Sequence, residues 1–281
     1  MTVATLAKEI PLTPEQAIPT YAVAAFLFFV STFVFRKMMR RIADRGGQVR
    51  SDFFRLPDVI VVAMFIVLLL LALAAQWLLP SSGVGAAGLQ FMLSVLVLAL
   101  PLILVLLVVR GISLPDVFGV KRVGLFRALA IGVGLVLLLL PLLSLVTTLS
   151  AYFFDGRVEQ QEVVKIFREA TKAGKRSVMW TVVLQAAVVL PIVEELLFRG
   201  YFYPVMKRIA GPIPAAIAIS LLFGAVHNNA AGFAVLTVLA LALTLAYEWS
   251  GSILVPIFMH QCFNATMLAL MWWQTVNGVT P

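Results

Sequence analysis

Polar and ionisable residues interrupt three otherwise apolar stretches of this 281-residue chain. The stretches contain, in order, Glu194, Glu195 and Arg199; then His227; then His260 and Asn264. An ionisable group at the centre of a membrane-spanning helix costs about 2.5 to 3.5 kcal/mol on insertion scales, so such groups mark a functional site by default. A carboxylate, two imidazoles and a carboxamide together suit hydrolysis.

The reaction that these groups suit is hydrolysis of an amide by direct attack of water. A carboxylate in an apolar environment is a better base near neutral pH, so Glu194 can deprotonate a water. His227 can hold that water and exchange protons with the leaving amine. His260 and Asn264 both offer side-chain donors, which a tetrahedral oxyanion requires. The single cysteine, Cys262, lies off the helical stripe that these two share, and we expect no chemical role for it.

Helical spacing gives the two adjacent glutamates different partners. Glu195 and Arg199 are four residues apart, so they share a helix face and neutralise each other. Glu194 is rotated by about 100° from Glu195, which leaves it free to meet a partner on another helix. Phe223 and His227 are also four apart, and we expect the phenylalanine to form a wall of the cavity.

The composition indicates how these residues are positioned. Hydrophobic residues make up 62% of the chain and charged residues only 12%, which excludes a soluble globule with a polar surface. A helix needs about 20 apolar residues to cross a bilayer, so we predict an all-α polytopic membrane protein of about eight transmembrane helices, with the site in the bundle core. The expected spans are residues 17–35, 59–79, 89–109, 128–149, 180–207, 212–228, 231–248 and 251–272.

Basic residues predict the orientation of these spans. They gather after the first, third and fifth spans, in residues 36–55, 110–127 and 207–208, and such loops remain cytoplasmic. Both termini are therefore expected outside. The same pattern explains the net charge of +8, and the expected partner is the lipid bilayer, with no nucleic acid. Glu248 and Trp249, at the cytoplasmic end of the seventh span, are expected to be interface anchors.

One segment, residues 150–178, carries both basic and acidic residues although the predicted topology places it outside. Val163, Val164, Phe167 and Ala170 recur there at helical spacing, which predicts an amphipathic helix along the interface. Two interpretations stay open: a connecting helix, or a lid that guides substrate. Prolines inside three spans should kink the helices and free backbone groups that neighbouring helices must satisfy; they are Pro101, Pro141 and Pro191.

The polar residues fall at similar depths in the predicted bilayer. At about 1.5 Å per residue, Glu194, His227 and Asn264 each lie roughly 20 Å along their helices from the cytoplasmic side, and His260 lies roughly 14 Å from it. Groups from three different spans are thus expected to converge on one layer.

These residues together resemble a known series of motifs. Residues 191–200, with sequence PIVEELLFRG, followed by Phe223 with His227 and by His260 with Asn264, look like the motifs of the type II CAAX prenyl endopeptidase family. That family includes the CAAX-protease and bacteriocin-processing proteins of prokaryotes. The resemblance covers roughly residues 180–270, and residues 1–149 carry no matching motif. It divides the chain into N-terminal transmembrane helices, residues 1–126, and a protease-like membrane domain, residues 127–281.

The resemblance implies a glutamate-dependent intramembrane endopeptidase in the plasma (inner) membrane of a prokaryote. Glu194 would be the base that activates water, with His227 as its partner. His260 and Asn264 would form the oxyanion site, and Glu195 with Arg199 would orient the others. No cofactor is implied. The substrate would be a peptide or the tail of a membrane-associated protein, with or without an attached lipid. The oligomeric state is left open.

Three alternatives remain at this point. Glutamate and histidine are zinc ligands, although the sequence has no HExxH motif and no compact Cys or His cluster. A non-enzymatic membrane protein, such as an immunity factor or scaffold, could retain the motif for packing. A proton-coupled transporter would also use buried acids and histidines, although no inverted repeat is visible.

Overall fold

The structure is a computed structural model that describes residues 14–78, 84–154 and 162–278. Within these ranges all regular structure is helical, as the composition predicts. The helices are α2 (Pro14–Arg45), α3 (Leu56–Leu78), α4 (Val84–Val109), α5 (Leu114–Val117), α6 (Leu125–Phe153), α7 (Glu162–Lys172), α8 (Arg176–Leu184), η2 (Gln185–Val189), α9 (Leu190–Leu197), η3 (Phe198–Phe202), α10 (Tyr203–Ala210), α11 (Pro212–Val226), α12 (Ala230–Ser250) and α13 (Leu254–Val276).

Six helical segments in the described residues are long and apolar enough to cross a membrane. The expected span 89–109 lies within α4, which has 26 residues, and the expected span 212–228 corresponds to a shorter apolar helix, Pro212–Val226. This shorter helix is α11, whose 15 residues extend about 22 Å and therefore fall short of a hydrocarbon core of about 30 Å. The prediction of a polytopic all-α membrane protein is confirmed.

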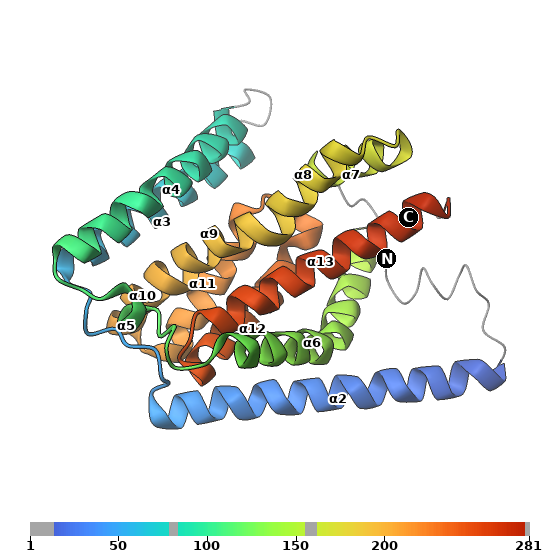
Figure 1. Cartoon of the computed structure of the whole chain (residues 1–281), viewed down its shortest axis with the longest axis horizontal. Coiled ribbons are helices and arrows are strands. Elements are labelled where there is room, and N and C mark those ends of the chain that lie inside the picture. The colour runs from blue at the N-terminus through green and yellow to red at the C-terminus, as the bar shows by residue number, and fades with distance from the viewer. Residues whose placement is uncertain (1–13, 79–83, 155–161, 279–281) are drawn as a thin grey trace.

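The basic segments lie together at one end of the helix bundle, as the sequence predicts. Figure 1 shows the α2–α3 and α4–α6 connections and the end of α10 at one end of the molecule, while α7, the start of α2 and the end of α13 lie at the other. The three basic segments of the sequence thus share one end, which we call the basic end. Which side of the membrane it faces stays a prediction.

Buried ionic contacts close the basic end. Glu248, 1% exposed on α12, accepts hydrogen bonds from Lys207 Nζ and Tyr203 Oη, both at 2.6 Å, and from the backbone N–H of Val49 at 3.1 Å. Glu248 is therefore a structural link between three segments and not the interface anchor expected from the sequence. Nearby, the buried Asp58 pairs with Arg110 at 2.9 Å.

Two apolar cores flank α12. One joins α3, α4, α10 and α11 and includes Leu69, Tyr203 and Phe223; the other joins α2, α6, α12 and α13. In the second core α6 approaches α13 closely at Gly132, where a Cβ would lie 2.9 Å from the backbone nitrogen of Met259. The glycine thus sets how near α13 can come to α6.

The charged segment before α8 forms the amphipathic helix that its spacing predicts. Phe167 and Ala170 of α7 are 2% and 3% exposed, and Val163 packs beside them in a small core with Val182 and Leu268. The helix therefore folds back on α8 and α13, at the end opposite the basic end (Figure 1).

Candidate active site

The two glutamates lie in a long helix interrupted by two π-helical turns. The continuous segment Arg176–Ala210 runs through η2, α9 and η3, and α9 carries Glu194 and Glu195. A π-helical turn inserts one extra residue and often occurs at a functional site. Pro191 follows η2 and has no backbone N–H to donate to that turn.

Side chains of α13 satisfy carbonyls that this irregular turn presents. Asn264 Nδ2 donates to the Ala186 oxygen at 2.8 Å, and Gln261 Nε2 donates to the Val188 oxygen at 3.2 Å. This contact confirms that the span containing Pro191 has backbone groups satisfied by a neighbouring helix. The two amides dock α13 against η2, just before α9.

Glu195 and Arg199 form the ion pair that their spacing predicts. Glu195 Oε1 accepts from Arg199 Nη1 at 2.8 Å, and both side chains are completely buried. Arg199 Nη2 also donates to the Ala240 oxygen at 3.0 Å, and its Nε lies 3.4 Å from Thr244 Oγ1. The pair is therefore anchored on α12, which supplies the remaining acceptors that a buried guanidinium requires.

His260 connects this pair to the second glutamate. Its Nδ1 lies 2.8 Å from Glu195 Oε1, the same oxygen that accepts from Arg199. Its Nε2 lies 3.7 Å from Glu194 Oε2. The imidazole is buried, whereas the Glu194 side chain is 27% exposed. A hydrogen bond on one ring nitrogen fixes the orientation of the other, so Glu195 directs His260 Nε2 toward Glu194.

Phe223 lies at the centre of these groups. The side chain is fully buried, and its ring centroid is 4.6 Å from the His227 ring and 5.9 Å from the His260 ring. The Arg199 guanidinium carbon lies 4.7 Å from the same centroid, a cation–π geometry. His227 Nδ1 lies 2.7 Å from the Phe223 carbonyl oxygen, which fixes that imidazole at the end of α11.

The helices thus bring together the residues selected from the sequence, with one difference in pairing. The imidazole that contacts Glu194 is His260, while His227 reaches the cluster through Phe223. Asn264 turns a donor toward η2. Sequence reasoning missed Thr244 and the carbonyls of Ala186 and Ala240; Thr244 could have been noticed as a hydroxyl inside an apolar span.

The described residues contain no group of three or more His, Cys, Asp or Glu side chains arranged to hold a metal ion. One buried oxygen, Glu195 Oε2, has no hydrogen-bond partner within the described ranges. The carboxylate therefore directs all its hydrogen bonds through Oε1.

Comparison with known proteins agrees with the motif series. Residues 176–266 match the protein-family model described as Rce1-like, type II CAAX prenyl endopeptidase Rce1-like. Neither the curated proteins nor the solved structures give a significant match. The division into residues 1–126 and 127–281 stays a prediction. Across residues 176–266, which hold every polar residue of the site, this chain is similar to the Rce1-like type II CAAX prenyl endopeptidases, a family of proteases.

Proposed function

We propose that this protein is an intramembrane endopeptidase that hydrolyses a peptide bond with water activated by Glu194. One observation carries the proposal. The accessible Glu194 carboxylate lies 3.7 Å from the His260 imidazole, and the other ring nitrogen of His260 contacts the buried ion pair of Glu195 and Arg199. The match of residues 176–266 to a protease family supports the same reaction class.

In the proposed reaction a water lies within hydrogen-bond distance of both Glu194 Oε2 and His260 Nε2. Glu194 takes one proton as the water oxygen bonds to the scissile carbonyl carbon, whose π electrons move onto the carbonyl oxygen. When the tetrahedral intermediate collapses, the C–N bond breaks and the leaving nitrogen receives the proton from Glu194. A positioned general base of this type contributes about 10²- to 10⁴-fold to the rate.

The two ring nitrogens of His260 support a second part of the proposal. Nδ1 faces the buried Glu195 and Nε2 faces the accessible Glu194. An imidazole with a hydrogen on Nε2 donates from that atom, and Asn264 keeps one N–H beyond the bond to Ala186. These two donors would stabilise the oxyanion. His227, whose Nδ1 donates to the Phe223 carbonyl, would accept a hydrogen bond at Nε2 from the leaving N–H while Glu194 supplies the proton.

We also propose that the substrate is a peptide or protein tail held at the membrane, with a lipid attached. A groove of about 470 Å³ lies between α3 and α11, and its lining is almost wholly apolar. It borders the helix that carries Phe223 and His227, and includes Leu222, Ala225 and Phe233. An acyl or prenyl chain fits this lining chemically.

The decisive experiment is cleavage of a membrane-peptide library by purified protein, read by mass spectrometry. Glu194→Gln should lower cleavage about 10²- to 10⁴-fold, because the amide cannot take the proton. Glu169→Gln, an exposed glutamate on α7, is the matched control and should cleave like wild type. Retained cleavage in Glu194→Gln would refute the proposed base.

The same assay separates the alternatives. Loss of cleavage on chelation, restored by zinc, would favour a zinc-dependent hydrolysis over the proposed mechanism. A folded wild type without cleavage, together with a Glu194→Gln variant that keeps its biological function, would favour an immunity or scaffold protein. Proton-coupled flux in vesicles would favour a transporter.

A further inference from the structure

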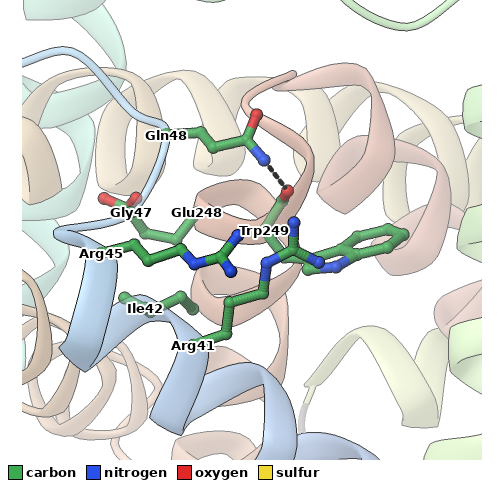
Figure 2. A pocket seen from close by; sticks show the side chains of 7 residues that line it. All are labelled: Arg41, Ile42, Arg45, Gly47, Gln48, Glu248 and Trp249. Atoms are coloured by element: carbon green, nitrogen blue, oxygen red, sulfur yellow. Dashed lines mark hydrogen bonds between the residues drawn. The ribbon is translucent and has the colours of Figure 1, made fainter.

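A pocket lined by charged residues lies at the basic end, away from Glu194 and Glu195. It is a half-open pocket of about 220 Å³ between the last turns of α2 and α12. Figure 2 shows the residues that line it: Arg41, Ile42, Arg45, Gly47, Gln48, Glu248 and Trp249. None of them belongs to the site described above.

Two arginines give this pocket a positive charge. Arg41 and Arg45 are one helical turn apart on α2, and both side chains reach from α2 toward the α12 side of the pocket (Figure 2). Neither guanidinium has a hydrogen-bond or ion-pair partner within the described part of the chain. Four other arginines at this end have acceptors: Arg50, Arg110, Arg122 and Arg208.

The one acidic residue of the pocket does not compensate these arginines. Glu248 Oε1 already accepts from Lys207 and Tyr203, and Oε2 accepts from the Val49 N–H. Since Lys207 balances the carboxylate, the two arginines give the residues that line the pocket a charge of +2. Unpaired like charges on one side of a pocket repel, and a bound anion would relieve that repulsion.

The surroundings indicate that the anion comes from the membrane. On α2 the residues before the pocket expose apolar rings to the outside, with Phe29 and Phe33 69% and 66% exposed. The pocket lies where α2 changes from apolar to basic residues, which corresponds to the level of the lipid head groups. Trp249 and Ile42 add apolar walls, and tryptophan is enriched at this level of a membrane.

We propose that this pocket binds the phosphate-bearing head group of an anionic phospholipid. The phosphate would lie between Arg41 and Arg45, whose planar guanidinium groups match phosphate geometry, and the glycerol carbons would lie against Ile42 and Trp249. The lipid would then connect α2 to α12. The assignment does not depend on the proposed protease activity.

The test titrates the full-length protein in detergent with phosphatidylglycerol, and with phosphatidylcholine as a neutral lipid, and counts bound lipid by native mass spectrometry. Wild type should prefer the anionic lipid. Arg41→Gln with Arg45→Gln should weaken its binding about tenfold. The matched control, Arg36→Gln with Arg40→Gln, removes the same charge from exposed positions of α2 that do not line the pocket and should change binding less than twofold.

Two outcomes would contradict the assignment. An equal loss in both double variants would mean general attraction to a basic surface. Full displacement of the lipid by millimolar inorganic phosphate would mean that the pocket takes a free phosphate. Because the four arginines are exposed and no described acceptor depends on them, all variants should keep the wild-type unfolding temperature, which is measured without added lipid.

Discussion

Glu194 and Glu195 are neighbours in sequence but differ in their surroundings. The Glu195 side chain is completely buried and shares one oxygen between Arg199 and His260, while the Glu194 side chain remains 27% exposed. Water can reach the accessible Glu194 carboxylate, whereas burial keeps water from Glu195. The proposed base is therefore the first glutamate, and the second is a positioning residue.

Asn264 has two possible functions, which one pair of variants separates. If its free N–H stabilises the oxyanion, Asn264→Ala should lower kcat about 10²- to 10³-fold. The matched control is Gln261→Ala, which removes the neighbouring side-chain bond to the same π-helical turn and should leave kcat within a few-fold of wild type. Equal losses of kcat and of unfolding temperature in both variants would make Asn264 only a contact between helices.

The position of His260 depends on how closely α13 approaches α6. Gly132 of α6 faces the backbone beside it, so a methyl group there must displace α13. We expect Gly132→Ala to destabilise the protein by about 1–3 kcal/mol through overpacking and to lower kcat. Detergent unfolding and cleavage of the same peptide measure the two effects.

Gly134, two residues further along α6, provides the control. A Cβ at Gly134 would meet nothing within 4 Å, so Gly134→Ala brings only the gain in helix propensity, about 1 kcal/mol. It should unfold at or above the wild-type temperature with unchanged kcat. If the two alanine variants behave alike, close packing of α6 on α13 does not position His260.

The molecule as a whole is held at its basic end by Glu248. This residue links the loop after α2, the end of α10 and α12, so its loss should loosen segments far apart in sequence. We expect Glu248→Ala to cost about 3–5 kcal/mol of unfolding free energy, because Lys207 would remain 9% exposed without its counter-charge.

The exposed pair of Arg50 and Asp52 is the control for that prediction. Their side chains are 47% and 60% exposed, so Asp52→Ala should cost less than about 1 kcal/mol. Both variants are compared with wild type by chemical unfolding in the same detergent. Similar costs in the two variants would show that burial of Glu248 adds no stability.

Some features of this arrangement could be predicted because they depend only on composition or on spacing along a single helix. Composition required membrane-spanning helices, and a separation of four residues required the contact between Glu195 and Arg199. Counting helical rise placed three segments at similar depth, and His260 does lie beside the two glutamates. The amphipathic spacing of Phe167 and Ala170 predicted their burial.

Other features depend on the rotation and contact of whole helices, which local spacing does not specify. The sequence by itself determined the membrane class, the polar residues of the site and the pairing within one helix. Only the tertiary structure decided that His260 meets Glu194, that Asn264 turns toward the π-helical turn before Pro191, and that Glu248 is buried. The physical reason is that each of these contacts joins groups from separate segments, whose relative placement is fixed by helix packing throughout the bundle.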